Sequence, residues 1–224
     1  MEVSKAEEFI NYINNNFNNN GIFNGRFTYT EFSIKVTKNS VLDSRSSTNK
    51  GFLNSNIDSI LLILDRFNFP IDLIDKVKHY YSTHKFIIFG IDSSKLDTIY
   101  KVYFEKVNGG VGIKWNSKKY DIEYYLEKPI TDLPEITKKF NFPLFNQDLK
   151  RLIYMYNENN SKEAFLLQFI KNTFLKDIPK EILDIIYINR SKKILTIEKY
   201  PLNYVSCGID DNKNIYYTIY YSII

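Results

Sequence analysis

The sequence predicts an α+β fold in which antiparallel β-hairpins alternate with helices. A hairpin pattern occurs twice, as GIDSSKLDTIYKVYFEK at 90–106 and as GIDDNKNIYYTIYYS at 208–222. Each copy has Gly-Ile-Asp, a short polar loop and a strand of alternating polarity. Apolar residues at helical spacing lie between the strand-rich stretches, for example at 57–67 and 71–81.

The composition is that of an ordinary globular protein. Of the 224 residues, 44% are hydrophobic and 25% are charged, and no linker interrupts them, so we expect one domain spanning 1–224. The longest aliphatic run, ILLIL at 60–64, is too short to cross a bilayer, and no signal peptide is evident. The single cysteine, Cys207, suits a reducing compartment. We therefore expect a cytoplasmic protein without a membrane partner.

The charged residues and the histidines argue against a nucleic-acid-binding protein and against a histidine metal site. The net charge of +4 is mild and the Lys and Arg residues do not cluster, so we expect no nucleic-acid partner. His79 and His84 lie five residues apart, which is a poor arrangement for a metal site. The composition is instead biased toward aromatic residues, with 18 Tyr and 17 Phe.

The elements follow from the local pattern. A helix around 4–13 precedes an Asn-rich loop at 14–25, and the stretch 26–36 alternates as a strand. Pro70 divides the two helices at 57–67 and 71–81. The remaining predicted elements are hairpins over 85–106 and 111–127, helices at about 133–140, 146–156 and 162–176, a strand at 192–200 and the closing hairpin from 204.

The predicted strands have one apolar and one polar face. Lys101, Tyr103 and Glu105 share a side opposite Val102 and Phe104. If the sheet is open, its polar face is solvated; if it closes into a barrel with helices outside, the same residues line the interior. The residues alone leave both arrangements open. Two further polar sets occur on later strands: Asp121, Glu123, Tyr125 and Glu127, and then Tyr216, Thr218 and Tyr220.

Four blocks of the chain resemble motifs of the cyanobactin-type peptide prenyltransferases. They are TEFSIKVTKNSVLDSR (30–45), the first Gly-Ile-Asp hairpin, KYDIEYYLE (119–127) and the final Gly-Ile-Asp hairpin. This family belongs to the aromatic prenyltransferases, so the resemblance implies their αββα (ABBA) fold, an antiparallel barrel of ten strands with helices outside. The chain is shorter than family members by roughly one helix–hairpin unit, which leaves open a shortened barrel, an incompletely closed one, or one completed by other segments. Thr218 stands where the first hairpin has Lys101.

The resemblance also implies an activity. Members of the cyanobactin-type family transfer an isoprenyl group from an allylic diphosphate, such as dimethylallyl or geranyl diphosphate, to a side chain of a ribosomally made peptide. The expected partners are therefore the diphosphate donor and a peptide acceptor, with Mg²⁺ held mainly by the diphosphate. No DDxxD motif occurs, so we expect no metal ligands from the protein. We also expect a monomer.

The same resemblance assigns roles to individual residues. Glu31 falls at the catalytic carboxylate, where it would take the proton of the acceptor, a step typically worth about 10²–10⁴ in rate. The cationic positions near the diphosphate are Lys35, Arg45 and Lys101, which supply charge-assisted hydrogen bonds. The residues that would shield the prenyl cation with their rings are Tyr103, Tyr125 and Tyr220.

Two other functions stay open at this stage. One is a degenerate barrel that binds an isoprenoid or a peptide without reacting, and the other is an α+β interaction protein with exposed polar strand faces. A glutamate in mid-strand and exposed lysines are usually just solvated, and DSRSST around Arg45 resembles a polar loop.

Overall fold

The computed structural model describes residues 4–16, 28–37, 40–53, 56–84, 86–93, 97–143, 148–159, 161–188, 198–210 and 212–221. Among these residues, no helix combines the length and the apolar character needed to cross a membrane. The helices are α1 (Lys5–Asn16), α2 (Ile57–Arg66), α3 (Ile74–Thr83), α4 (Leu133–Lys139) and α5 (Lys180–Ile188), with 3-10 turns η1 (Ile71–Leu73), η2 (Ile130–Asp132) and η3 (Leu175–Asp177). The strands are β1 (Thr28–Thr37), β2 (Ser40–Leu53), β3 (Phe86–Ser93), β4 (Thr98–Lys106), β5 (Gly109–Trp115), β6 (Tyr120–Lys128), β7 (Leu149–Asn157), β8 (Glu163–Thr173), β9 (Leu202–Ile209) and β10 (Ile215–Tyr221).

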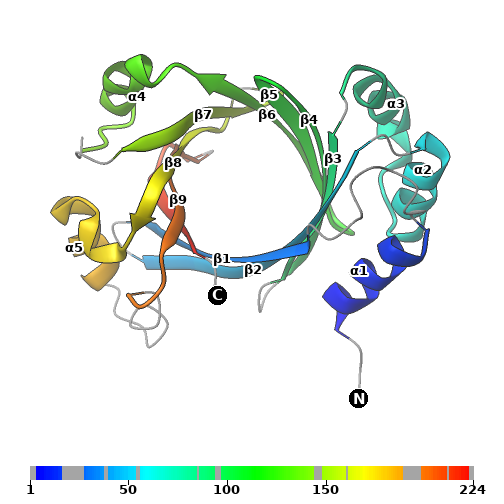
Figure 1. Cartoon of the computed structure of the whole chain (residues 1–224), viewed down its shortest axis with the longest axis horizontal. Helices are drawn as coiled ribbons and strands as arrows, with labels where there is room; N and C mark the ends of the chain where they lie inside the picture. The colour runs from blue at the N-terminus through cyan, green and yellow to red at the C-terminus, as the bar shows by residue number, and fades with distance from the viewer. Residues whose placement is uncertain are drawn as a thin grey trace. The chain divides into compact units, whose positions relative to one another are not determined.

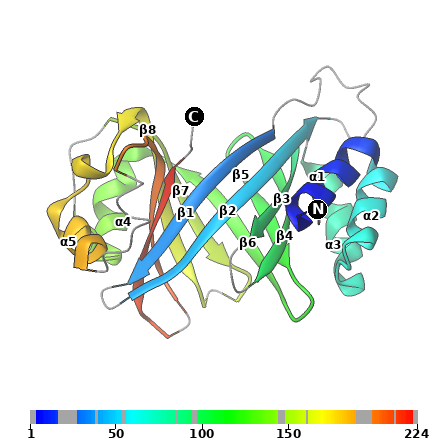
Figure 2. The ribbon, with the colours of Figure 1, turned by 90° about the horizontal axis from the view of Figure 1, so that it is seen from below.

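The strands of the described residues form one closed antiparallel barrel. Their order is β1-β10-β9-β8-β7-β6-β5-β4-β3-β2, so all neighbours except β1 and β10 are consecutive in the chain (Figure 1). The pairing of β1 with β10 closes the sheet, with Lys35 opposite Thr218 and Phe32 opposite Tyr221. Strands β1 and β2 run side by side (Figure 2). The predicted antiparallel barrel with helices outside is confirmed.

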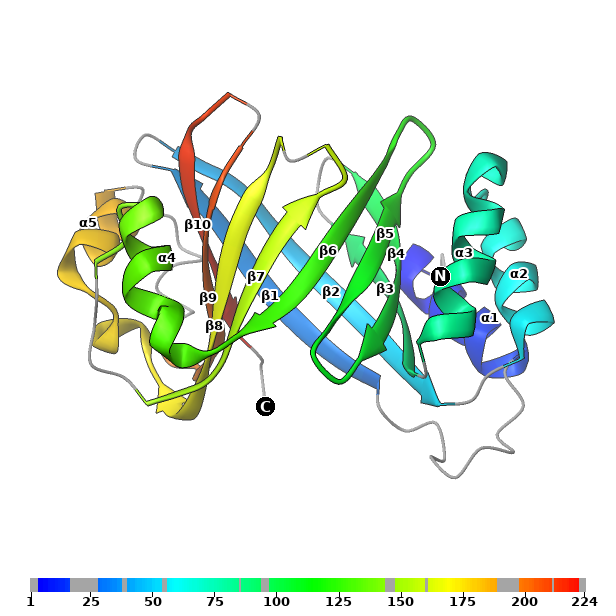
Figure 3. The same cartoon turned by 90° about the horizontal axis from the view of Figure 1, so that it is seen from above.

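Two of the predicted helices are wrong. The segments expected as helices at 146–156 and 162–176 are the strands β7 and β8, which pair with each other (Figure 3). Both segments have apolar residues on both strand faces, and short apolar runs of that kind fit the helical period of 3.6 residues as well as the strand period of two. In β8, the period is two: Phe165, Leu167 and Phe169 are buried against helices, and Leu166 lies on the other face.

The corrected hairpin restores the full strand count. With β7 and β8 included, the described residues supply ten strands, so the barrel closes without the loss of a hairpin that the chain length suggested. The polar stretch around Arg45 is part of the 14-residue strand β2 and not a loop. Helix α5 was not predicted. Of the strand predicted at 192–200, residues 192–197 lie outside the described residues, and 198–200 form a turn.

The chain divides into two compact units, each with its own core. Unit 1 comprises Met1–Thr30 and Ser47–Tyr124, and unit 2 comprises Glu31–Ser46 and Tyr125–Ile224. In unit 1, helices α1, α2 and α3 pack on one face of the strands. The Trp115 indole N–H donates to the Phe67 carbonyl at 2.9 Å, and Phe9 packs edge-on against Phe67 with ring centroids 4.7 Å apart.

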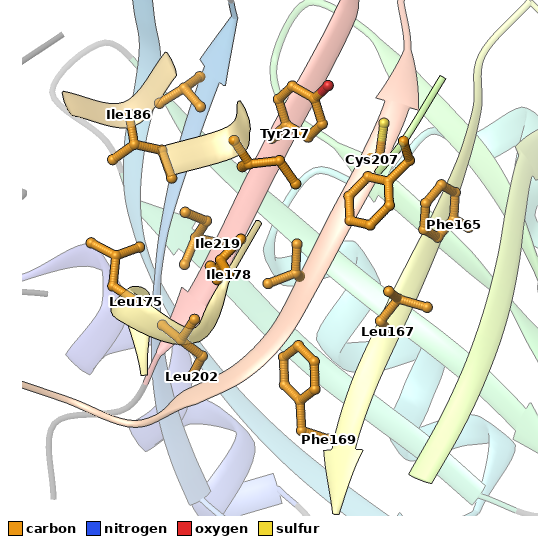
Figure 4. Packing of buried hydrophobic residues seen from close by; sticks show 14 of the residues in the cluster. Phe165, Leu167, Phe169, Leu175, Ile178, Ile186, Leu202, Cys207, Tyr217 and Ile219 are labelled. Carbon is orange, nitrogen blue, oxygen red and sulfur yellow. The ribbon is translucent and has the colours of Figure 1, made fainter. Parts of the chain in front are cut away.

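In unit 2, helices α4 and α5 cover one face of β7 to β10 and β1. Figure 4 shows α5 and η3 over this face, with Ile186 and Leu175 directed at side chains of β8, β9 and β10. Burying an apolar side chain of this size contributes about 1.5–3 kcal/mol. Cys207 belongs to the same core, and burial raises the pKa of its thiol to about 12, so it is protonated at neutral pH.

Candidate active site

The inner face, meaning the sheet face turned away from the helices, carries a row of polar residues in unit 1. Val102 and Phe104 are completely buried beneath the helices, so alternation places Lys101, Tyr103 and Glu105 on the inner face, as predicted. Lys101 lies opposite Gly90 of β3 and Lys114 of β5. The inner face of β4 is therefore flanked by one glycine and a second lysine.

Lys101 lies at the centre of a buried polar cluster. Its side chain is 7% exposed, and its Nζ contacts Asp92 Oδ1 at 2.5 Å and Ser47 Oγ at 2.8 Å. The same Nζ lies 5.8 Å from the centroid of the Tyr103 ring. Burial acts to raise the pKa of Asp92, but the Lys101 ammonium and the hydrogen bonds from Lys101 and Ser47 outweigh it and hold this pKa below its ordinary value. The charge of Lys101 is thus fixed in place and partly compensated.

Gly90 provides the space for this cluster. A Cβ atom at Gly90 would collide with Oδ1 of Asn49 and would lie 3.1 Å from Cε of Lys101. The Asn49 amide in turn donates to Ser47 Oγ at 3.0 Å. The absence of a side chain at Gly90 therefore makes room for the side chains that cross above it.

A second ion pair lies beside the first. Lys114 is directly opposite Lys101, and like charges in this position repel each other. Its Nζ lies 2.5 Å from Oε2 of Glu123 on β6, just as Lys101 contacts Asp92. Unit 1 therefore presents two ammonium groups with two carboxylates. An incoming anion would compete with those carboxylates for the ammonium N–H groups.

The predicted catalytic carboxylate, Glu31, lies on β1 in unit 2. Asn203 Nδ2 donates to Glu31 Oε1 at 3.2 Å. Asn203 occupies an irregularity of β9, because Tyr220 pairs with Tyr204 whereas Tyr221 pairs with Leu202. Such bulges redirect a side chain and are common beside active sites. The bulge thus holds one oxygen of Glu31 in a defined direction.

Lys35 is on the same strand face as Glu31, four residues further along. At about 3.4 Å per residue, the two Cα atoms lie about 14 Å apart. Lys35 Nζ lies 3.5 Å from the centroid of the Tyr216 ring, a close cation–π contact. Tyr216 pairs with Gly208, and a Cβ at that glycine would collide with the ring. Tyr216, and not Thr218, therefore occupies the position that Lys101 has in the first hairpin.

Tyrosines and an amide continue the inner face of unit 2. Tyr220 packs edge-on against Tyr204 with ring centroids 6.1 Å apart. The Gln168 Nε2 donates to Tyr204 Oη at 3.4 Å. Tyr220, one of the predicted cation-shielding residues, is therefore part of a row that runs across β10, β9 and β8.

Two predicted site residues remain, and each lies on a strand of the barrel. Arg45 on β2 and Tyr125 on β6 are half-buried residues of unit 2. Of the predicted site, Lys101 and Tyr103 belong to unit 1, where the structure brings them together, and Glu31, Lys35, Arg45, Tyr125 and Tyr220 belong to unit 2.

Sequence reasoning missed several partners of these residues. Asp92, Lys114 and Glu123 build the ion pairs of unit 1, and Asn203 holds Glu31. A signal for Asp92 was present, because the Gly-Ile-Asp sequence places its glycine and aspartate on the same strand face as Lys101. No signal marked Asn203, because a bulge cannot be located without the register of the neighbouring strand.

The described part of the chain offers no cluster of three or more His, Cys, Asp or Glu side chains suited to a metal ion. Asp92 and Glu123, which lie on the inner face, already pair with lysines. As ion-paired groups, these two carboxylates do not form a ligand set for Mg²⁺.

The fold can be compared directly with solved structures, although no family model and no curated protein matches the sequence. PriB, solved as a binary complex with product diphosphate, is similar with a TM-score of 0.56 over 86% of this chain and 79% of PriB, at 9% identity. The 5-dimethylallyltryptophan synthase of Streptomyces coelicolor gives 0.51 over 86% and 80%, at 9% identity. AnaPT from Neosartorya fischeri gives 0.52 over 88% and 78%, at 10% identity.

The fold is the αββα (ABBA) barrel. At this level of identity the likeness establishes the architecture, with its ten antiparallel strands and outer helices. It does not assign roles to side chains, because unrelated activities occur on shared folds.

Proposed function

We propose that the protein transfers an isoprenyl group from dimethylallyl or geranyl diphosphate to an aromatic side chain of a peptide. The observation that carries the proposal is the presence, in an ABBA barrel, of lysines beside tyrosine rings on the inner strand faces: Lys101 by Tyr103 and Lys35 on Tyr216. Ionising an allylic diphosphate requires cationic groups for the leaving anion and π-faces for the carbocation. The similar structures, one with product diphosphate and one named a dimethylallyltryptophan synthase, support this substrate class.

The first step is departure of diphosphate. The allylic C–O bond breaks and its electron pair leaves with the diphosphate, whose charge Lys35, Arg45 and Lys101 would balance. Tyr103, Tyr125 and Tyr220 would face the resulting carbocation, each ring contributing about 0.5–2 kcal/mol. Exclusion of water by the barrel would prevent hydrolysis of the cation.

The second step is capture of the carbocation. The acceptor's electron pair forms the new bond, and its proton passes to Glu31, the proposed general base. Asn203 would act as a positioning residue, because its amide hydrogen bond orients the Glu31 carboxylate. Diphosphate and the prenylated peptide are the products.

No step of this proposal passes through a metal ion. Any Mg²⁺ would be bound by the diphosphate oxygens, where it would further balance the charge of the leaving group. The protein would act as a monomer in the cytoplasm, with residues 1–224 as a single domain.

Mass spectrometry tests the proposal. The protein is incubated with each diphosphate, with Mg²⁺ or with a chelator, and with peptides that contain Tyr, Trp, Ser or Arg. We expect a mass gain of one prenyl group on a Tyr or Trp peptide. Absence of product with every donor and acceptor would refute the proposal.

A non-catalytic binding barrel is the second candidate. The observation that favours it is that Lys101 on β4 and Lys114 on β5 already have carboxylate partners, as in a purely structural cluster. This candidate predicts a thermal shift with the diphosphates but no product.

A further inference from the structure

Strand β2 carries a lysine on the sheet face opposite the candidate active site. Ser47 of β2 contacts Lys101, which lies on the inner face. Alternation along the strand therefore directs Lys50 and Phe52 to the face that the helices of unit 1 cover. Phe52 belongs to the core beneath those helices, and its ring lies edge-on to Phe89 with centroids 6.4 Å apart. Lys50 is therefore a cationic residue beside an apolar core.

Lys50 and Lys101 are buried to the same extent but differ in their partners. Each residue, backbone included, is 6% exposed. Lys101 contacts Asp92 and Ser47, whereas no carboxylate and no hydrogen-bond acceptor among the described residues reaches the Lys50 Nζ. The Phe52 ring lies near this ammonium group, with its centroid 5.6 Å from the Nζ. Buried lysines are ordinarily paired, so Lys50 lacks the ion pair that would explain a structural role.

The nitrogen of Lys50 is open to solvent although most of the residue is buried. A fully enclosed Nζ without a hydrogen bond would be an unsatisfied polar atom, and Lys50 has no such atom. The aliphatic stem therefore accounts for most of the burial, and the Nζ extends to the edge of the core. A small molecule in solution can reach this nitrogen.

The surroundings of Lys50 favour its neutral form. Burial lowers the pKa of Lys50 below its ordinary value, and no charged group opposes this effect. Each unit by which an amine pKa falls raises its neutral fraction about tenfold at a pH below that pKa. The neutral amine is the nucleophilic form of lysine. At Lys101, by contrast, the adjacent Asp92 carboxylate favours the charged ammonium.

We infer that Lys50 is a reactive amine that forms an imine with a small apolar aldehyde. The lone pair of the nitrogen forms a bond to the carbonyl carbon, and the carbonyl oxygen leaves as water with the two amine protons. The product replaces an unpaired amine beside the Phe52 ring with a neutral, less polar group, which suits an apolar surrounding. This site lies on the helix-covered face of unit 1 and is independent of the proposed prenyl transfer.

Reductive trapping tests the inference. The protein is incubated at pH 7 with 3-methylbutanal and cyanoborohydride, which converts an imine to a stable secondary amine, and mass spectrometry of peptides measures the labelling rate of each lysine. Lys50 should be labelled about 10-fold faster than Lys101, the equally buried lysine with a carboxylate partner. It should also be labelled faster than Lys78, whose side chain is 54% exposed. Labelling of Lys50 no faster than that of Lys78 would overturn the inference.

A polar aldehyde tests the class of ligand. Glyceraldehyde should label Lys50 more slowly than 3-methylbutanal does, relative to the labelling of Lys78 by each compound, because its hydroxyl groups would lose water beside the Phe52 ring. Equal relative labelling by the two aldehydes would overturn the assignment of an apolar ligand.

Two variants separate the reactivity of Lys50 from a structural role. Lys50→Arg keeps the positive charge, but its guanidinium stays protonated, so the fast-labelled site should disappear while the other lysines keep their rates. Lys50→Met should have a Tm equal to or above that of the wild type, because an unpaired charge beside the core is replaced by an apolar side chain. A clear fall in the Tm of Lys50→Met would show that the ammonium stabilises the fold and would overturn the inference.

Discussion

The two Gly-Ile-Asp hairpins share a sequence pattern and differ in chemistry. In unit 1, the glycine lies opposite Lys101, and the aspartate, Asp92, forms a buried ion pair with that lysine. In unit 2, the glycine lies opposite Tyr216, and Asp210 accepts hydrogen bonds from the backbone N–H groups of Asn212 and Asn214 in the turn. The first aspartate is part of the inner face, whereas the second shapes the loop.

The difference shows what the shared pattern specifies. In both hairpins the glycine makes room for a long side chain from the partner strand, Lys101 over Gly90 and Tyr216 over Gly208. The pattern therefore fixes a close approach of backbone and side chain. Which side chain arrives there, an ammonium or a phenol, decides the chemistry of each inner face.

The largest expected difference in stability is between variants of the two aspartates, Asp92 and Asp210. Asp92→Ala leaves the Lys101 ammonium buried without its carboxylate and should lower the free energy of unfolding by about 3–5 kcal/mol. Asp210→Ala removes exposed turn hydrogen bonds and should cost about 0.5–1.5 kcal/mol. Urea denaturation of both variants measures the contrast. Similar losses for the two variants would contradict the distinction between the hairpins.

A double replacement sharpens the contrast in unit 1. Lys101→Met combined with Asp92→Leu exchanges the ion pair for apolar groups and should be more stable than Asp92→Ala alone, because no buried charge remains unpaired. A double-mutant cycle over Lys101→Met and Asp92→Leu gives the coupling. Additive losses would show that the two residues do not interact as the geometry indicates.

The next largest difference in stability is expected between alanine variants of the two hairpin glycines, Gly208 and Gly90. At Gly208, an added Cβ would meet the Tyr216 ring and would lie 2.8 Å from the Ala164 Cβ, which is fixed to its backbone. We expect Gly208→Ala to lower the free energy of unfolding by about 1–3 kcal/mol. At Gly90, the neighbours are the ends of Asn49 and Lys101, which can move, so Gly90→Ala should cost less. Thermal unfolding ranks the two variants, and the reverse order would contradict the assignment of rigid and movable neighbours.

The smallest effect is the dependence of stability on pH. Burial acts to raise the pKa of Asp92, but Lys101 and Ser47 hold it below the ordinary value in the folded state. Asp92 therefore contributes stability above its unfolded pKa of about 3.9, and this contribution is lost as pH falls through the lower folded pKa. Stability in Asp92→Asn should fall less steeply in acid than in the wild type. Parallel curves from pH 5 to pH 2 would contradict the shift.

Much of the fold follows from local pattern, and one part of it does not. The polar and apolar faces of β4 and β6 and the helices over 57–67 and 71–81 were predictable, because period and turn chemistry agree there. Strands β7 and β8 were not, because stretches such as LKRLIYMY and AFLLQF have apolar residues on both faces. Their inner faces include apolar residues such as Ile153 and Leu166 where other strands are polar, so an alternation of polar and apolar residues does not mark these segments as strands.

The candidate site, like the fold, was predictable from the sequence only in part. The placement of Lys101 and Tyr103 on one face follows from alternation, and the structure confirms that placement. Their partners follow from register. The connection of the second hairpin is three residues shorter than that of the first, because Tyr216 follows its partner Gly208 by eight residues and Lys101 follows its partner Gly90 by eleven. Alignment by sequence therefore matched Thr218 with Lys101, whereas the register matches Tyr216. The catalytic roles of Glu31, Lys35, Arg45 and the tyrosines stay predictions.

The rate of prenyl transfer in Glu31→Gln tests the central claim most directly. Turnover is measured by mass spectrometry with dimethylallyl diphosphate and a tryptophan peptide, beside Glu163→Gln as a matched control, whose carboxylate pairs with Lys139 on helix α4. The account predicts that Glu31→Gln loses about 10²–10⁴ in rate while keeping its thermal shift with the diphosphate, and that Glu163→Gln keeps its turnover. Equal turnover in the wild type and Glu31→Gln would contradict the role of Glu31.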